Sequence, residues 1–202
     1  MSMYYTKQQL LDFYEAEGRR GDHQKNMYFS NKSPHSRQRF ERVKDLLSQY
    51  VPDQRFLELG CAEGLYCQEA ERLTDKLVVG MDISMPKIMR CRRGFKHTLY
   101  MQGDWDNLPF GENEFDVALL TEGLEHSLDP GQLLRNIASI SRVLILTVPL
   151  EKSLLAEPLG KDSNGHLHLF TYDKAKKMME GAGYTVVDGV ASELYAYLVG
   201  KK

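Results

Sequence analysis

The sequence lacks the long apolar runs and the cysteine pairs that would indicate a membrane protein or a secreted one. No stretch approaches the roughly eighteen consecutive apolar residues of a membrane-spanning helix. The first ten residues are polar and show no signal-peptide pattern. Cys61, Cys67 and Cys91 cannot all pair with one another, and none forms a C-x-x-C motif. We therefore expect a protein without a membrane span in a reduced, cytoplasmic setting.

An excess of charge of either sign is missing as well. The formal net charge is −2 over 202 residues. Nucleic acids and anionic membranes attract basic surfaces, so this balance argues against a nucleic-acid partner. One dense basic cluster occurs, and it is interpreted as a solvated helix face rather than as a phosphate or RNA contact. Its members are Lys87, Arg90, Arg92, Arg93 and Lys96.

What the sequence does contain is a short apolar strand followed by a turn of small residues, in the segment 56–64 (FLELGCAEG). Glu58 lies in the strand, and the small residues Gly60, Ala62 and Gly64 fall at every second position of the turn. Small residues let the backbone approach a ligand closely. Helical spacing from Tyr66 onward places the turn at a helix N-terminus, where free N–H groups suit a polar, nucleotide-like ligand.

Three further apolar segments, 77–84, 101–105 and 115–120, each carry an acidic residue. In the first, the Asp82 carboxylate could accept both hydroxyl groups of a ribose, and in the second Asp104 could accept the N6 donor of adenine. A single acid at a strand end is more simply interpreted as a loop or helix cap. Four strand-plus-acid segments in order, about twenty residues apart, favour a nucleotide site instead.

The order and spacing of these segments resemble the motifs of class I S-adenosylmethionine (SAM) methyltransferases. The first family motif is usually an acid followed by G-x-G-x-G, and alanine replaces the middle glycine here. The resemblance implies SAM as the cofactor, with Glu58 near its methionine amino group. It also implies Asp82 at the ribose, Asp104 at the adenine amino group, and Ile83 and Trp105 against the purine faces. The full set of expected cofactor-binding residues is Glu58, Gly60, Ala62, Gly64, Asp82, Ile83, Asp104, Trp105, Thr121 and Tyr28.

The remaining pattern predicts one methyltransferase domain over residues 1–202, with an N-terminal helical lid over 1–50 and a SAM-binding core over 51–202. Strands alternate with helices from Arg55 onward, which indicates an α/β fold with a mainly parallel sheet and helices on both faces. The resemblance implies a Rossmann-like sheet of seven strands whose last strand is antiparallel. In the lid, helices are predicted at 7–17 and 36–50. In the C-terminal half, helices are predicted from Asp129-Pro130 onward and at 171–182, and strands at 140–148, 184–190 and 193–199.

Candidate catalytic residues follow the fourth strand. Glu122, Glu125 and His126 offer two carboxylates and an imidazole within five residues, and such groups can ligate a divalent cation. E-x-x-E-H with a later histidine resembles O-methyltransferases of ubiquinone biosynthesis and enzymes that methylate 2′-hydroxyls at small-RNA 3′ ends. That resemblance implies a metal such as Mg²⁺ held by Glu122, Glu125, His126 and His166, with His168 as the alternate. Two alternatives stay open, a metal-free general base at His126 and a structural role for the motif.

These patterns predict a SAM-dependent methyltransferase that acts on a small hydroxylated acceptor, with metal assistance as an option. The chain lacks the N-P-P-Y type of motif that serves base-amino and glutamine methylation, so oxygen is the favoured nucleophile. The alternatives are an RNA 2′-O-methyltransferase and a non-catalytic SAM-binding protein. Tyr14 and Tyr28 in the lid either face the SAM sulfonium or pack between helices.

Overall fold

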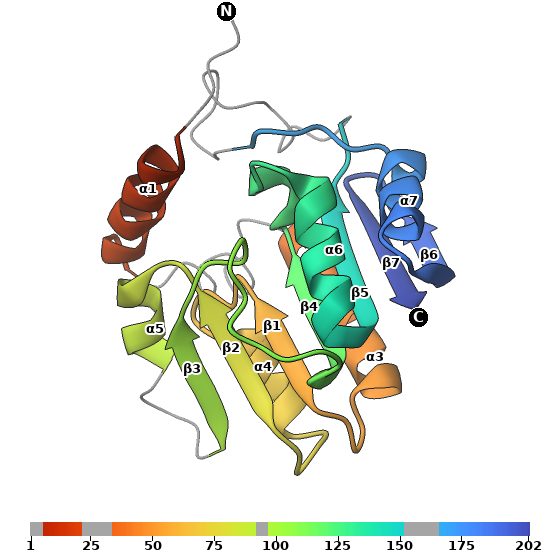
Figure 1. Ribbon diagram of the computed structural model, residues 1–202, viewed down its shortest axis with the longest axis horizontal. Coiled ribbons are helices and arrows are strands. Elements are labelled where there is room, and N and C mark those ends of the chain that lie inside the picture. The colour runs from red at the N-terminus through yellow and green to blue at the C-terminus, as the bar shows by residue number, and fades with distance from the viewer. Residues whose placement is uncertain (1–5, 22–33, 92–96, 152–165) are drawn as a thin grey trace, which may run out of the picture.

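A seven-stranded sheet with the order β3-β2-β1-β4-β5-β7-β6 forms the centre of the protein (Figure 1). The computed structural model describes residues 6–21, 34–91, 97–151 and 166–202. Strands β1 to β5 are parallel, and β7 is antiparallel to both β5 and β6, which confirms the predicted sheet. The strands are β1 Phe56–Leu59, β2 Val78–Asp82, β3 Thr98–Gln102, β4 Phe115–Thr121, β5 Ser141–Pro149, β6 Thr185–Ala191 and β7 Tyr195–Lys201.

Helices cover both faces of this sheet, as the alternation of strands and helices predicts. One face carries α3, α4 and α5, the other carries α6 and α7, and α1 packs against α5 (Figure 1). Their bounds are α1 Lys7–Arg19, α3 Pro34–Tyr50, α4 Leu65–Glu71, α5 Met85–Cys91, α6 Pro130–Ile140 and α7 Tyr172–Gly181. No helix within the described ranges is both long and apolar enough to cross a bilayer.

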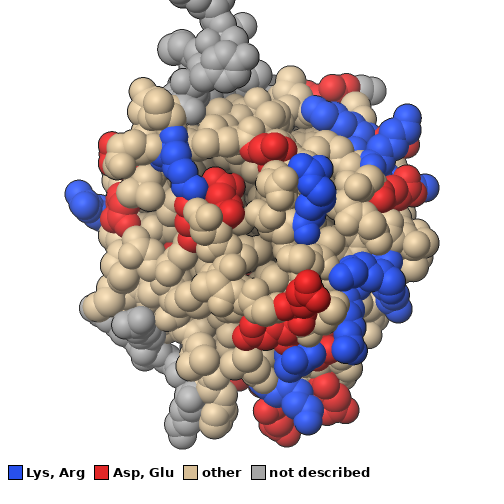
Figure 2. Space-filling model, in the orientation of Figure 1, with Lys and Arg blue, Asp and Glu red and all other residues tan. Residues whose placement is uncertain are grey.

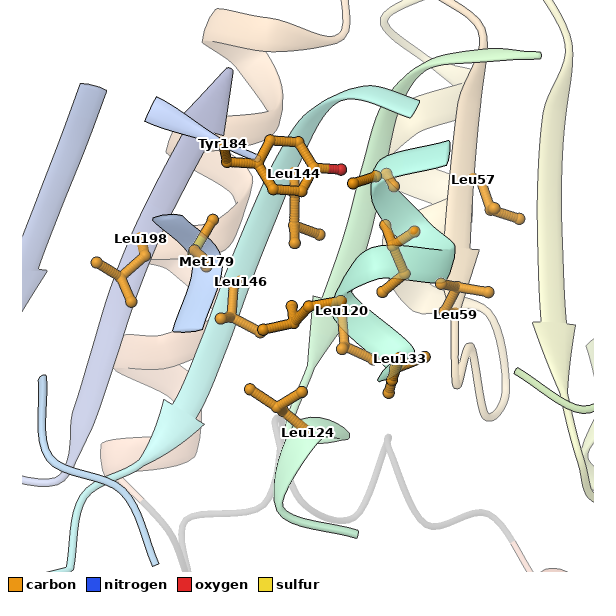
Figure 3. Close-up of a cluster of buried hydrophobic side chains, with 14 of the residues drawn as sticks. Leu57, Leu59, Leu120, Leu124, Leu133, Leu144, Leu146, Met179, Tyr184 and Leu198 are labelled. Atoms are coloured by element: carbon orange, nitrogen blue, oxygen red, sulfur yellow. The ribbon is translucent and has the colours of Figure 1, made fainter. Parts of the chain in front are cut away.

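The alternation of side chains along each strand divides the core into two layers. In β1, Leu57 and Leu59 pack with the apolar side chains of α6 and α7, whereas Phe56 packs with those of α3 and α4 (Figure 3). Successive strand residues point to opposite faces, so every strand that is covered on both sides supplies both layers. The central strands therefore bury nearly all of their side chains and hold their carboxyl ends in a fixed register.

Local sequence signals set the N-terminal ends of α1 and α6. Asp129 accepts a hydrogen bond from the Gln132 N–H, and Pro130 occupies the first turn of α6, as predicted. Thr6 forms a reciprocal capping box with Gln9 at the start of α1. The predicted strand at 140–148 begins one residue late, because Ile140 still belongs to α6. The predicted strand pair near the C-terminus is confirmed as an antiparallel hairpin, shifted by one or two residues.

Candidate active site

The turn after β1 uses backbone that L-residues rarely adopt. Gly60, Ala62 and Gly64 have φ values of 70°, 47° and 76°, so every second residue lies in the left-handed region. Glycine adopts this region without cost, and alanine pays a modest strain. A Cβ added to Gly64 would lie 2.6 Å from the Tyr100 ring, which explains why this position carries no side chain. The alternation of small residues in the sequence therefore reflects an alternating backbone conformation.

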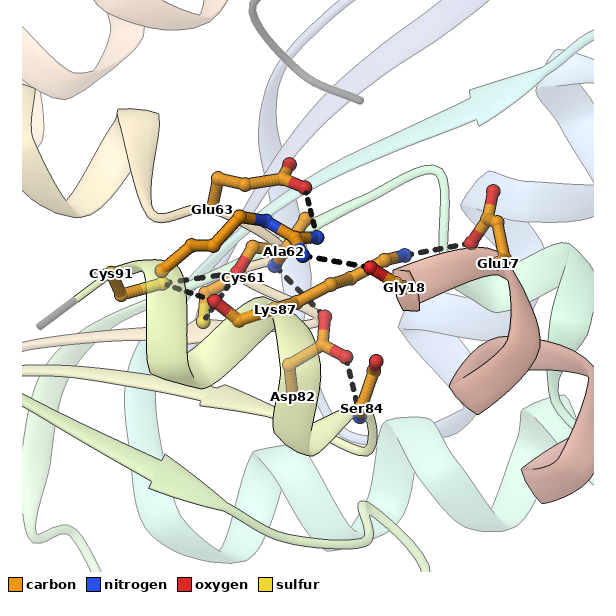
Figure 4. A network of polar contacts seen from close by, with 10 residues as sticks. Glu17, Gly18, Cys61, Ala62, Glu63, Asp82, Ser84, Lys87 and Cys91 are labelled. Atoms are coloured by element: carbon orange, nitrogen blue, oxygen red, sulfur yellow. Dashed lines mark hydrogen bonds and ion pairs between the residues drawn. The ribbon is translucent and has the colours of Figure 1, made fainter. Parts of the chain in front are cut away.

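Asp82, at the end of β2, is held against this turn by backbone amides. Its Oδ2 accepts a hydrogen bond from the Ala62 N–H at 2.8 Å, and its Oδ1 accepts one from the Ser84 N–H at 2.8 Å (Figure 4). Burial raises the pKa of Asp82, although nearby Lys87 and the two amides offset that effect in part. A carboxylate has about four lone-pair sites, so each oxygen retains capacity for one more donor. Asp82 thus keeps acceptor capacity on both carboxylate oxygens.

Ion pairs and a hydrogen bond hold helix α1 beside Asp82. Lys87 donates to Glu17 at 2.7 Å, and Arg90 bridges the Gly18 carbonyl at 2.7 Å and the Glu63 carboxylate at 2.9 Å (Figure 4). The interpretation of this basic cluster as a solvated face is therefore wrong for its described members. Lys87 is buried and Arg90 is half-buried, because both reach from α5 to α1 and the turn. Arg92, Arg93 and Lys96 lie outside the described residues.

The predicted adenine-binding residues follow β3. Asp104 forms an ion pair with Lys7 of α1, and Lys7 also donates to Asp106 at 2.9 Å. The half-buried Trp105 ring lies 3.6 Å from where a Cβ on Gly60 would stand, so it borders the turn. Ile83 is half-buried directly after Asp82. The residues expected around an adenine and a ribose therefore come together at the carboxyl ends of β1, β2 and β3.

Glu58, in the middle of β1, is held by contacts with α4. Its side chain is fully buried and points toward α4, where Oε2 accepts hydrogen bonds from the Cys67 N–H and thiol, both at 2.9 Å. Oε1 forms no hydrogen bond within the described part of the chain. Burial raises the pKa of Glu58 to about 8, and the contacts with Cys67 offset this only in part. The Glu58 side chain thus links β1 to the start of α4, next to the turn. Its contact with a methionine amino group stays a prediction.

Glu122 lies apart from the other candidate catalytic residues. It directly follows Thr121, the last residue of β4, and its φ of 49° turns its side chain toward α3. There Oε2 pairs with Arg39 at 2.7 Å, and Oε1 accepts a hydrogen bond from Thr147 of β5 at 3.0 Å. Arg39 is only 3% exposed, so the pair is largely desolvated. A positive φ strains the backbone of a non-glycine residue, and residues strained in this way cluster at functional sites.

A compact cluster forms instead from Glu125, His126 and His166, whose candidate ligand atoms all lie within 4.8 Å of one another. Glu125 and His126 belong to the 3₁₀ helix η1, Leu124–His126, which follows β4. The Glu125 carbonyl accepts hydrogen bonds from Leu167 and His168, and these bonds bring the His166 segment alongside.

Electrostatics mark Glu125 as the unusual member of this cluster. Its side chain is fully buried, and neither carboxylate oxygen has a hydrogen bond of ordinary geometry within the described residues. Burial and the Glu122 carboxylate raise its pKa well above the usual range. The His126 Nε2 lies 3.7 Å from the Glu125 Oε1. The cluster thus concentrates proton-accepting groups in a buried place.

Some of the predicted residues fall elsewhere, and others were not predicted. The ring of His168 bonds to the Ser127 carbonyl at 2.9 Å and not to the cluster, so His166 takes the place for which both were candidates. Tyr28 lies outside the described residues. Arg39 was not predicted. Its signal is an arginine within the apolar helical stripe that contains Phe40 and Val43.

Comparison with known proteins decides the family. Residues 35–188, about three quarters of the chain, match the family model described as a methyltransferase domain. The chain is a class I SAM-dependent methyltransferase. The matched region includes the turn at 60–64, Asp82, Asp104 and the Glu122–His126 segment, whereas α1 lies outside it.

Relatives of this methyltransferase share its family and fold at low identity. An uncharacterized methyltransferase of Synechocystis is 34% identical over 46% of the chain and 43% of its own length. A ubiquinone/menaquinone biosynthesis C-methyltransferase of Idiomarina loihiensis is 29% identical over 44% of the chain and 46% of its own length. The matches thus span less than half of these curated relatives. The solved magnesium protoporphyrin IX methyltransferase of Synechocystis, with bound S-adenosylhomocysteine (SAH), has a TM-score of 0.71 and 15% identity, covering 98% of the chain and 100% of its own.

Proposed function

We propose that the protein transfers a methyl group from SAM to a small hydroxylated acceptor. The observation that carries this proposal is the Glu125, His126 and His166 cluster, which lies at the end of β4 on the same sheet edge as the nucleotide turn. SAM already carries an activated methyl group. The protein must therefore bind it, align an acceptor and remove the acceptor's proton.

The cofactor half of the site has one group for each part of SAM. The left-handed turn at 60–64 leaves backbone space for the methionine portion, Asp82 accepts from the ribose, and Asp104 accepts from adenine. For Asp104 to do so, its contact with Lys7 must rearrange or be shared. Trp105 supplies an aromatic face beside the turn.

The acceptor half of the site, at the end of β4, removes the proton of the acceptor's hydroxyl group. An imidazole titrates near neutrality, so His126 is suited to accept the proton of a hydroxyl group, and a Glu125 carboxyl oxygen lies 3.7 Å from its Nε2. Arg39 and Thr147 keep Glu122 away from this reaction and fix the end of β4. The buried surroundings exclude water from the transfer.

The three clustered residues also have the chemistry of a cation site. A buried carboxylate without ordinary hydrogen bonds and two imidazoles within 4.8 Å form a nitrogen-rich donor set, which suits Zn²⁺, Mn²⁺ or Fe²⁺ better than Mg²⁺. As the alternative to a free His126 base, we propose Glu125, His126 and His166 as ligands of a cation, with Glu122 held outside by Arg39. A cation there would lower the pKa of an acceptor hydroxyl as a Lewis acid.

Hydroxylated acceptors are also supported by the relatives' names and by the surface. The Idiomarina relative is named a ubiquinone/menaquinone biosynthesis C-methyltransferase. A protein of Amycolatopsis mediterranei named 27-O-demethylrifamycin SV methyltransferase is 25% identical over 60% of the chain and 48% of its own length. Deprotonating a phenolic hydroxyl activates either its oxygen or the adjacent ring carbon, so one base can serve both outcomes.

Basic and acidic side chains are interspersed on the face shown in Figure 2, as expected of a small-molecule enzyme rather than a polyanion binder.

The test separates turnover from cofactor binding. Release of SAH is measured with a panel of phenols, catechols and hydroxyquinones, before and after chelation and after return of Zn²⁺, Mn²⁺ or Mg²⁺. His126→Ala should lower turnover at least about a hundredfold while SAM affinity changes little. His168→Ala, outside the cluster, is the matched control. Full activity in chelator would reject the cation, and equal loss of turnover and SAM affinity would reject the catalytic role of His126.

A further inference from the structure

Tyr14 on α1 reaches the centre of the candidate active site. Its ring meets the His126 ring edge to face, with centroids 5.7 Å apart, and the Lys87 Nζ lies 5.9 Å from the Tyr14 centroid. The flanking residues on α1 are fixed to α5, because Glu15 accepts from the Met85 N–H at 2.9 Å and Glu17 pairs with Lys87. Tyr14 is therefore placed between the ribose acid and the proposed catalytic histidine.

The hydroxyl group of Tyr14 is buried and has no hydrogen-bond partner among the described residues. Burial and the carboxylates of Glu125, Glu17 and Asp82 raise its pKa, so the phenol stays protonated at neutral pH. A buried hydroxyl without a partner is costly, and such groups in native proteins often mark a place where a ligand completes the contact.

The charges around this hydroxyl favour a cation. Three carboxylates interact with it, and of these Glu17 is already paired with Lys87. Asp82 is bound by two backbone amides, and Glu125 faces His126. Lys87 is the one ammonium group near the Tyr14 ring in the described structure, and its charge is shared with Glu17. SAM carries a sulfonium between its ribose and its reactive methyl group, whereas the product SAH carries a neutral thioether at the same position.

We propose that the Tyr14 hydroxyl oxygen contacts the SAM sulfonium and its methyl group, and that this contact lets the protein bind SAM in preference to SAH. The phenol oxygen points a lone pair at the polarised methyl and sulfur, a contact that disappears once the methyl is transferred. Tyr14 is thus a specificity-determining residue that weakens product binding relative to substrate binding. This inference rests on the use of SAM and needs neither the proposed acceptor nor the proposed cation.

Calorimetric titration of SAM and SAH into wild-type protein and Tyr14→Phe tests the inference. Tyr14→Phe keeps the ring against His126 and removes only the oxygen. We expect SAM affinity to fall about two- to fivefold while SAH affinity is unchanged, since a contact of this kind is weak. Tyr50→Phe, at the far end of α3, is the matched control and should change neither affinity. Thermal unfolding confirms that both variants fold.

Two outcomes would overturn the inference. Equal loss of SAM and SAH affinity would mean that the hydroxyl binds a group that both molecules share, such as the methionine carboxylate. No change in either affinity would mean that it serves the acceptor or only packs. Neither outcome decides whether the protein methylates a small hydroxylated acceptor. A protein that binds both molecules but methylates none of the panel would fail the proposed function and leave this inference standing.

Discussion

The pH dependence of stability should report directly on the buried carboxyl group of Glu58. This group lies beneath the nucleotide turn with one oxygen bonded to Cys67 and the other without a hydrogen bond in the described structure. The substitution Glu58→Gln resembles the protonated form, because its amide oxygen can still accept from the Cys67 N–H. Wild-type protein and the variant should therefore behave alike at low pH and diverge as Glu58 ionises.

The direction and size of the divergence follow from the raised pKa. The ordinary value of 4.5 applies to the unfolded chain, and burial raises the folded value to about 8. The folded state binds the proton more tightly, so the free energy of unfolding falls as pH rises between these two values and is level above about 8. At about 1.4 kcal/mol for each pH unit, the whole loss is on the order of 5 kcal/mol. This is a large part of the 5–15 kcal/mol or so that stabilises a typical domain.

Urea unfolding of both proteins between about pH 5 and 9, without SAM, measures this effect. Subtracting the two curves removes the contributions of other titrating groups. Asp116→Asn is the matched control, because hydrogen bonds with Arg55 lower the pKa of Asp116 from its ordinary 3.8, so Asp116 stays ionised across this range and its variant should differ from wild type by a constant amount. A constant difference between wild type and Glu58→Gln across this range would refute the reasoning.

Further predictions concern the ion pair and the turn. Arg39→Met should lower the free energy of unfolding by about 3 kcal/mol, because it leaves a desolvated Glu122 carboxylate, and adding Glu122→Gln should restore much of the loss in urea unfolding. Gly64→Ala should lower the free energy of unfolding more than Gly60→Ala does. Gly60→Ala adds only backbone strain of about 1 kcal/mol or more, whereas at position 64 the new Cβ would also collide with Tyr100. Equal melting temperatures for these two glycine variants would contradict that view.

The fold was predictable because its signals are local and repeated. The Asp129-Pro130 pair marks the start of α6 in any context, and apolar runs that end in acids mark strands of a covered parallel sheet. Asp82 and Asp104 were also predictable, since the carboxyl ends of neighbouring parallel strands meet at one edge. The cofactor half of the site therefore follows from strand order.

The acceptor half depends on conformations that sequence does not reveal. Nothing in the sequence indicates that Glu122 adopts a positive φ and turns to Arg39, because non-glycine residues seldom do so. For Glu58, strand alternation shows only that it faces away from Leu57, and both faces of β1 are buried. Likewise, only the bonds from Leu167 and His168 to the Glu125 carbonyl bring His166 into the cluster.

The central claim is that SAM binds at the turn with Asp82 holding its ribose. Calorimetric titration of SAM into wild-type protein and Asp82→Asn tests it most directly, with Asp45→Asn on the exposed side of α3 as the control. We predict saturable binding at one site per chain, weakened at least about tenfold by Asp82→Asn, since a charge-assisted hydrogen bond contributes about 1.5–3 kcal/mol. Absence of SAM binding to the folded wild-type protein, or equal affinity in Asp82→Asn, would contradict the claim.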